Sequence, residues 1–294
     1  MSIRHVREDS LPHGAVEQAA PGVRRILCNN PGAHTFRGTN TWIIGRGRVA
    51  VLDPGPADAD HLAAILRAVE GETVTHILVS HTHRDHSPGV AALKAATGAP
   101  SLGFGRHLTP PEQGGEGGDH DFTPDILLPD GALTEGDAWR VTALHTPGHC
   151  ANHLCFALEH DGPDGILFSA DHVMAWSTTV VGPPDGSMAD YMTSLAKLAA
   201  RGDALYLPGH GPALHDPMPY IAALAAHRME REAKVLDAVR KHGPASAAAL
   251  VPPVYGPDLD PRLVPAAARS LLAHLVKLAD EGLAVRDGEM WRGM

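Results

Sequence analysis

The segment 81–86 reads His-Thr-His-Arg-Asp-His and follows directly on a mainly apolar run. Imidazole and carboxylate groups bind zinc, iron and manganese well, whereas an oxygen-only ligand set suits calcium or magnesium. In an extended segment, residues two apart face the same side, so we expect His81 and His83 to share one cation. After the chain turns, Asp85 and His86 face elsewhere and are available to a second cation. The segment therefore predicts a metal site, with room for two ions, at the end of a strand.

Each of three later apolar runs leads to a further candidate ligand. The runs and the ligands that follow them are 141–144 with His149, 165–170 with Asp171, and 204–207 with His210. A glycine stands immediately before each of the two histidines, where it lets the backbone take turn conformations that a side chain would hinder. Sheet proteins build sites from residues at the carboxyl ends of several strands. We therefore expect these residues to converge on segment 81–86.

Together these residues resemble the metallo-beta-lactamase-fold hydrolases, whose pattern is His-x-His-x-Asp-His, then Gly-His, then Asp, then a second Gly-His. All seven ligand positions of that pattern are filled in this chain. The ligand sets that the resemblance implies are His81, His83 and His149 for one metal, Asp85, His86 and His210 for the second, and Asp171 as the bridge. It also implies an α/β fold, the four-layer αββα sandwich of that family.

The early stretches 40–44 and 49–55 are similar to the family's opening hairpin and its Asp-x-Gly turn, where we expect Asp53 to orient a ligand rather than to bind metal. Within the superfamily, a long C-terminal extension and motifs such as 208–212 are similar to the lactamase-beta-2-like group. That group carries a small winged-helix tail, and its members are linked to single-stranded RNA cleavage and to thioester hydrolysis on acyl carrier proteins. This chain departs from its relatives at Cys150, where they often carry Thr or Ser; a thiol there would tune the site, poison it, or simply pack.

A break at 216–219 divides the chain into a predicted hydrolase domain, 1–216, and a helical, winged-helix-like domain, 217–294. Apolar residues recur at helical spacing over 220–242, and Gly-Pro ends that helix. The elements expected after it are a helix over 245–250, a proline-rich turn, a helix over 265–280 and a hairpin that turns at 287–288. The glycine-rich segment 112–119 is expected to be a surface loop, an inert linker in preference to a substrate-gating lid.

The charge of the C-terminal tail bears on nucleic-acid binding. From Met218 onward the chain has ten basic and nine acidic residues, and Arg262, Arg269 and Lys277 are scattered among alanines and leucines. A nucleic-acid-binding helix would gather its basic residues on one face. We therefore favour packing or a homodimer contact over nucleic-acid recognition for this domain.

Two cations held a few ångströms apart would lower the pKa of a water between them, so that a metal-bridging hydroxide is the nucleophile at neutral pH. Asp85 or Asp171 would then accept and return a proton as catalytic residues. The chain has neither a Gly-x-Ser-x-Gly elbow nor a Walker loop. We expect a binuclear metal-dependent hydrolase with two divalent transition-metal ions, zinc foremost and iron or manganese as alternatives.

The substrate is the more open question. A carboxylic ester or thioester, as a small molecule or an acyl-thioester, is preferred because a chain of net charge -10 lacks the basic track of a nuclease. The alternatives are a single-strand endoribonuclease or phosphodiesterase, and a metal-binding protein without catalysis. Three scattered cysteines and an N-terminus without a long apolar run predict a cytoplasmic protein with no membrane partner.

Overall fold

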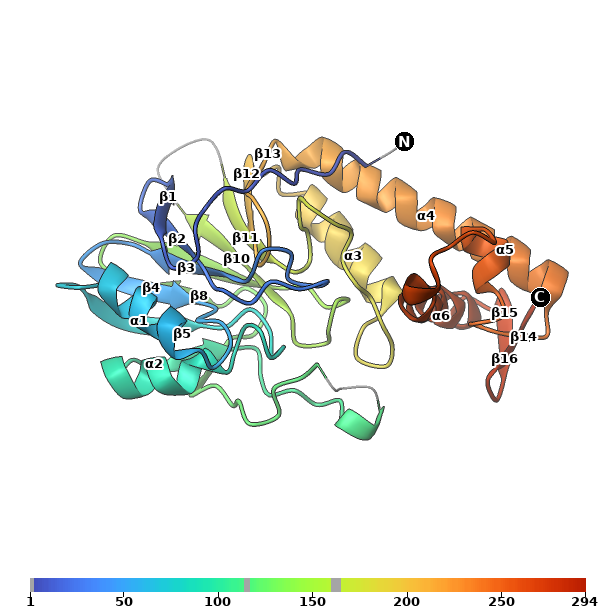
Figure 1. Ribbon diagram of the computed structural model, residues 1–294, viewed down its shortest axis with the longest axis horizontal. Helices are drawn as coiled ribbons and strands as arrows, with labels where there is room; N and C mark the ends of the chain where they lie inside the picture. Colours follow the sequence, from blue (N-terminus) through green and yellow to red (C-terminus); the bar gives the residue numbers. More distant parts are fainter. Residues whose placement is uncertain (1–2, 114–116, 160–164) are drawn as a thin grey trace.

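The computed structural model describes residues 3–113, 117–159 and 165–294. Two sheets pack face to face, helices cover both outer faces, and a helical part extends from one end of this sandwich (Figure 1). The α/β/β/α layering that the sequence resemblance implies is therefore confirmed.

The first sheet contains strands in simple chain order, antiparallel from β1 to β4 and parallel from β4 to β7. Its strands are β1 (Val16–Ala20), β2 (Val23–Leu27), β3 (Asn40–Ile44), β4 (Arg48–Leu52), β5 (Thr73–Leu78), β6 (Ser101–Gly103) and β7 (Ile126–Leu127). The predicted hairpin is the β3–β4 pair, in which Trp42 lies opposite Leu52. Helices α1 (Ala59–Ala68) and α2 (Gly89–Thr97) cover its outer face. Helix α1 begins where the Asp58 side chain accepts a hydrogen bond from the His61 amide.

The second sheet has the order β13-β12-β11-β10-β9-β8, and only the β11–β12 pair is parallel. Its strands are β8 (Leu133–Glu135), β9 (Arg140–His145), β10 (Leu154–Glu159), β11 (Ile166–Ala170), β12 (Leu205–Pro208) and β13 (Leu214–His215). Helix α3 (Met188–Ala199) and the first half of α4 (Pro217–His242) cover its outer face. A short 3-10 helix, η1 (Pro111–Gln113), lies between β6 and β7.

The main core lies between the two sheets. Trp42 and Leu52 project into it from the first sheet, and Phe156, Phe168 and Leu207 project from the second. Neighbouring residues on β3 alternate between this core and the helix-covered face, as the twofold periodicity of a strand requires. Replacing the buried Trp42 by alanine would lower the free energy of unfolding by about 3–5 kcal/mol. Because the core contains residues of both sheets, it holds the sheets and the loops at their edges in place.

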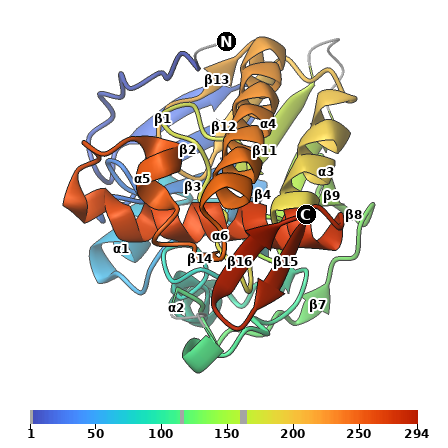
Figure 2. The ribbon, with the colours of Figure 1, turned by 90° about the vertical axis from the view of Figure 1, so that its right-hand side faces the viewer.

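Helix α4 leads from the sandwich into a C-terminal unit with a three-stranded sheet of order β14-β16-β15. The elements of this unit are β14 (Ala245–Ser246), α5 (Val251–Tyr255), η2 (Pro261–Leu263), α6 (Val264–Asp280), β15 (Ala284–Asp287) and β16 (Met290–Gly293). Figure 2 shows α6 crossing beneath the ends of α3 and α4, both of which it contacts. Helices followed by a terminal hairpin form the predicted winged helix.

One local prediction in this unit is wrong. A helix was expected over 245–250, but Ala245 and Ser246 form β14 and pair with Trp291 and Met290 of the wing. The helix α5 begins instead at Val251, inside the expected proline-rich turn. Prolines are tolerated in the first turn of a helix because the amides there have no intrahelical acceptor.

The division at residues 216 and 217 stays a prediction, because α4 belongs to both parts. Near its start, Tyr220 and Leu224 pack in the core beneath the second sheet. Near its end, Val235 and Val239 pack with α6 and the wing. Among the residues that the structure describes, no helix combines the length and apolarity needed to cross a bilayer.

Candidate metal centre

The predicted ligands lie just beyond the carboxyl ends of four strands. Segment 81–86 follows β5, His149 follows β9, Asp171 follows β11 directly, and His210 follows β12. The expectation that segment 81–86 is extended holds only at its start, because β5 ends at Leu78 and residues 84–86 form a turn. The turn brings the end of the segment back toward the strand ends, so the seven residues gather in groups of three whose ligand atoms lie within 4.8 Å of one another.

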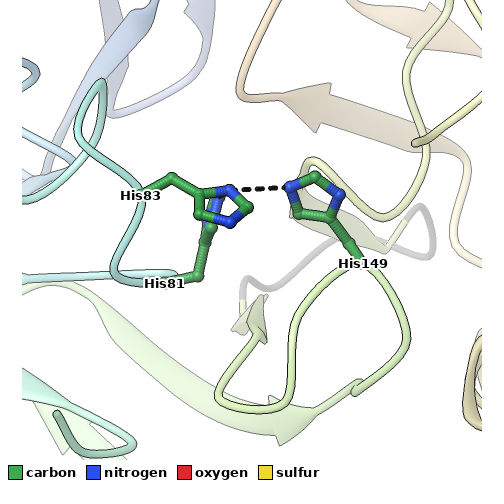
Figure 3. Close-up of side chains that lie close together, drawn as sticks. All are labelled: His81, His83 and His149. Carbon is green, nitrogen blue, oxygen red and sulfur yellow. Dashed lines mark hydrogen bonds between the residues drawn. The ribbon is translucent and has the colours of Figure 1, made fainter. Parts of the chain in front are cut away.

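The first cluster contains three imidazoles. The Nε2 atom of His81 lies 3.0 Å from Nδ1 of His83, and Nε2 of His149 lies 2.9 Å from the same atom. Figure 3 shows His83 and His149 pointing toward one another from two loops, with His81 beside His83. Three imidazole nitrogens that converge in this way could hold one metal ion.

The second cluster contains one carboxylate and two imidazoles. The Asp85 Oδ2 atom lies 3.1 Å from His210 Nε2 and 3.5 Å from His86 Nε2. These three residues form a second set whose ligand atoms are close enough for one ion. Both histidines are almost fully buried, whereas Asp85 is partly exposed at the cavity.

Asp171 lies between the two clusters. Its Oδ2 atom is 3.6 Å from His149 Nε2 and 3.4 Å from His210 Nε2, and its Oδ1 atom is 3.6 Å from His86 Nε2. One carboxylate therefore faces histidines of both sets. This position is what the bridging role expected for Asp171 requires.

Hydrogen bonds on the far side of the rings set which nitrogen faces the centre. The Nδ1 atom of His149 lies 2.7 Å from the Val180 carbonyl oxygen, and that of His210 lies 3.2 Å from the Gly38 carbonyl oxygen. A carbonyl only accepts, so each Nδ1 carries a hydrogen, and Nε2 is the nitrogen of each ring that faces the centre. The rings are therefore oriented for metal binding.

Asp53 orients the second cluster, as the sequence predicts. Its Oδ2 atom accepts hydrogen bonds from His86 Nδ1 at 3.0 Å and from the Ser80 hydroxyl at 2.6 Å. The Ser80 oxygen also lies 2.9 Å from His81 Nδ1. One buried carboxylate thereby fixes a histidine of each cluster, directly for His86 and through Ser80 for His81.

The two glycines that precede ligands serve different purposes. Gly148 has φ +140, a backbone conformation that side chains rarely adopt, as predicted for a turn. Gly209 is needed for space instead, because a Cβ atom there would lie 2.4 Å from Asp171 Oδ1 and 2.8 Å from His86 Cε1. The close approach of β12 to the second cluster therefore depends on the absence of a side chain.

The charges of the centre fit a bound cation. Burial and the neighbouring His149 lower the pKa of His83 to about 3, so this ring is neutral, as a ligand must be. Burial would also lower the pKa of His210, but Asp171 and Asp85 raise it to about 9. The buried atoms His86 Nε2 and Asp171 Oδ1 have no hydrogen-bond partner among the residues that the structure describes. Asp171 and Asp85 thus favour a positive charge at the second cluster, where the buried atoms His86 Nε2 and Asp171 Oδ1 lack hydrogen-bond partners among the described residues.

The centre opens into a cavity of about 690 Å³. Gly117 and Gly118 line it, and the Gly118 carbonyl accepts a hydrogen bond from the Arg84 side chain at 3.1 Å. The segment 112–119 was expected to be an inert linker; its described end contacts the site, while residues 114–116 lie outside the described part. Arg262 and Arg269, which are scattered in the sequence, also line the cavity into which the metal centre opens.

Sequence reasoning missed two further residues of the cavity wall, His107 and Asp185. Neither lies in a recognisable motif, and each is far in sequence from the ligands that it approaches. Cys150 is fully buried, and its thiol donates to Asn152 Oδ1 at 3.4 Å. Burial, together with Asp185 and Asp171, raises the pKa of Cys150 well above its ordinary value, so the group is a neutral thiol.

Comparisons with known proteins agree with this geometry. The metallo-beta-lactamase superfamily model matches residues 34–210, and the model of the beta-lactamase associated winged helix domain matches residues 246–291. The chain is 32% identical over 254 residues to an atrochrysone carboxyl ACP thioesterase from Passalora fulva. The aligned region covers 83% of this chain and 71% of the relative. The chain is 31% identical over 239 residues to the lactamase-like protein adaB from Aspergillus niger, covering 80% and 69%.

Two solved structures share the fold over nearly the whole chain. A beta-lactamase domain protein from Burkholderia ambifaria superposes with a TM-score of 0.79 at 24% identity, covering 97% of this chain and 96% of that one. A metallo-beta-lactamase family protein from Thermus thermophilus gives a TM-score of 0.75 at 21% identity, covering 94% and 99%. The likeness extends across the sandwich and the C-terminal unit together.

Proposed function

The chain belongs to the metallo-beta-lactamase superfamily and is a metal-dependent hydrolase, and from that membership we propose that it uses two metal ions to cleave an acyl thioester. The observation that carries the proposal is the pair of ligand clusters that face one carboxylate, Asp171, in a chain similar to thioesterases over most of its length. Residues 1–216 would form the hydrolase domain and residues 217–294 the appended domain.

The proposed ligands are those of the two clusters. One ion would be held by His81, His83 and His149, the other by Asp85, His86 and His210, with Asp171 shared. Divalent zinc, or iron or manganese, would polarise the scissile carbonyl and make water nucleophilic at neutral pH. That chemistry removes the need for a serine or cysteine nucleophile.

The chain's own residues would orient the reaction and handle its protons. Asp85 and Asp171 are the carboxylates of the ligand clusters and line the cavity, and we assign to them the acceptance and return of a proton. Asp53 holds the His86 ring in place from outside the centre. Cys150 takes no direct part, because its sulfur is buried and donates to Asn152.

Support for a thioester substrate comes from relatives at 30–32% identity that are named atrochrysone carboxyl ACP thioesterases. Two of them align with 96% and 97% of this chain, including the C-terminal unit. The net charge of -10 is also a poor match for a long polyanion. An acyl group on a carrier protein or a small thiol is therefore the proposed substrate class.

A phosphodiester substrate remains the second candidate because of one observation. Arg84, Arg262 and Arg269 all line the cavity, and guanidinium groups bind phosphate well. Single-stranded RNA is the substrate of this class to test.

One experiment separates the two. The purified protein is assayed side by side against a panel of acyl thioesters and against labelled single-stranded RNA, with chelator-treated enzyme as the control. We expect thioester turnover that chelation abolishes, and about two transition-metal ions per chain by elemental analysis. RNA cleavage without thioester turnover would contradict the proposed substrate, and a metal content near zero after gentle purification would contradict the binuclear centre.

A further inference from the structure

His107 has an unused hydrogen-bonding atom at the wall of the metal-site cavity. The residue lies in the loop after β6 and is only 7% exposed. Its Nε2 atom is buried and has no hydrogen-bond partner among the described residues, and the side chain lines the cavity with His83. A buried polar group without a partner is destabilising, because it has lost its hydrogen bonds to water without replacing them. Its place beside the metal centre suggests that a bound molecule supplies the partner.

The neighbouring chain holds the His107 ring in place. A Cβ atom on Gly118 would lie 2.4 Å from the ring's Cδ2 atom and 2.5 Å from Nε2, so the Gly118 backbone passes directly over the ring. The ring of His120 packs against it edge to face at 4.9 Å between centroids. The His107 ring, which lines the cavity, therefore has little freedom to turn.

A chain of buried hydrogen bonds determines where the His107 hydrogen lies. The Cys150 thiol donates to Asn152 Oδ1 at 3.4 Å, which leaves the Asn152 amide nitrogen to donate to the Thr82 hydroxyl oxygen at 2.7 Å. The same nitrogen lies 3.3 Å from the Gly105 carbonyl, which can only accept. The orientation of the Asn152 amide is thus fixed at both ends.

The Thr82 hydroxyl links the fixed Asn152 amide to the His107 ring. Because it accepts from Asn152, its own hydrogen is free to be donated to His107 Nδ1, which is 3.0 Å away. The Nδ1 atom is then an acceptor, and the neutral ring carries its hydrogen on Nε2. The nearest acid, Asp185, has its Oδ2 atom 3.9 Å from Nε2, too far for a hydrogen bond, and its Oδ1 atom accepts from Thr109 at 3.0 Å.

We propose that His107 donates a hydrogen bond from Nε2 to the acyl carbonyl oxygen of the substrate, and that Thr82 and Asn152 are positioning residues that keep Nε2 the donor. The inference rests on the thioester hydrolase activity proposed above. A donor that is already oriented stabilises negative charge as it develops on the oxygen, and a single such donor contributes a factor of about 100–1,000 in kcat.

The first test needs no substrate. Nitrogen-15 NMR of the metal-loaded protein distinguishes the two ring tautomers, and the His107 signals are those missing from His107→Gln. We expect an Nε2–H ring in the wild type and in Thr82→Ser, which keeps the hydroxyl. Thr82→Val, which has the same shape without the hydroxyl, should lose that preference. An Nδ1–H ring in the wild type would overturn the inference.

The second test is kinetic. His107→Leu should lower kcat for the best thioester of the panel by about a hundredfold, with two metals still bound. His107→Gln, whose amide nitrogen occupies the place of Nε2, should stay within about tenfold of the wild type. A His107→Leu enzyme within about twofold of the wild type, or a Gln variant as slow as the Leu variant, would overturn the donor role. If the wild type cleaves no thioester, the proposed function fails, and the NMR result alone decides the tautomer.

Discussion

At the scale of single residues, Asp171 is the carboxylate that lies between the two ligand clusters. Its two oxygens face histidines of both clusters within 3.6 Å. Asp171→Asn keeps the size of the side chain and removes its charge, and we expect the metal content to fall below two per chain and kcat to fall at least about a hundredfold. Elemental analysis and steady-state kinetics measure the two effects. Wild-type values for both would show that Asp171 does not bridge metals.

His61 gives a prediction about stability in acid. Its ring is buried, its Nε2 atom lies 2.7 Å from the Thr41 hydroxyl, and burial lowers its pKa to about 4. The unfolded chain takes up a proton near pH 6.5, whereas the folded chain resists protonation until about pH 4. The stability that depends on neutral His61 is therefore present above pH 6.5 and is lost as the pH falls toward 4, in total about 3 kcal/mol.

Urea unfolding of the chelated protein between pH 7 and pH 4 measures this dependence without a contribution from metal loss. We expect His61→Gln to unfold with a shallower pH dependence than the wild type. Replacing the exposed His215 by Gln is the matched control and should leave the slope unchanged. Equal slopes for the wild type and His61→Gln would contradict the assignment.

At the scale of elements, the turn after β12 shows how closely two segments approach at the centre. A side chain at Gly209 would collide with Asp171 and His86. We expect Gly209→Ala to weaken metal binding by about 10- to 100-fold. In Gly103→Ala the new atom would meet its nearest neighbour at 3.5 Å, an ordinary contact, so that variant serves as the control. Metal titration compares the two, and equal affinities would show that the β12 turn adjusts without cost.

The start of α6 and the preceding η2 contribute a wall of the cavity that only the C-terminal unit can supply. Arg262 and Arg269 line this wall, and Gly182 lies so close that a Cβ atom there would be 2.5 Å from Arg269 Nε. Replacing either arginine by alanine should raise KM about fivefold for a thioester on a phosphate-bearing carrier. The KM for a small uncharged thioester should be unchanged.

Lys277 on the same helix provides the control for the arginines. Its amino group pairs with Glu232 at 2.7 Å and does not line the cavity. Lys277→Ala should therefore leave both KM values unchanged. An equal rise in KM for charged and uncharged thioesters in the arginine variants would mean that the wall acts through shape rather than charge.

At the scale of the whole molecule, the proposed metals link the two halves of the sandwich. Ligands follow β5 of the first sheet and β9, β11 and β12 of the second, so bound ions hold both sheets together at one edge. With free metal at about a hundred times Kd, each bound ion would add about 2.7 kcal/mol to stability. We expect chelation of both ions to lower the melting temperature by about 10–20 °C. An unchanged melting temperature in a protein shown to lose its metal would contradict this linkage.

Much of the fold could be predicted because its signals are local. Apolar runs that end in His-x-His or Gly-His mark strand ends, and helix α4 follows from helical periodicity. The β3–β4 hairpin was expected from the family resemblance. The helix expected over 245–250 was wrong because local propensity does not report the pairing of β14 with a wing strand some 45 residues later. The inert linker expected over 112–119 stays a prediction, although its described end contacts the site, since Gly118 meets His83 and His107 in the folded chain.

By itself, the sequence determined which side chains are available as ligands, that they follow strands, and which family pattern they complete. The family resemblance implied a bridging role for Asp171 and an orienting role for Asp53. Only the tertiary structure decided how closely Asp171 approaches both clusters, that His86 is the ring that Asp53 holds, and that Gly209 leaves room for Asp171 and His86. It also decided that His107 and the arginines of the C-terminal unit share the cavity with the metal centre. The physical reason is that strand periodicity and turn chemistry act over a few residues, whereas hydrogen bonds and close packing join residues that are distant in the chain.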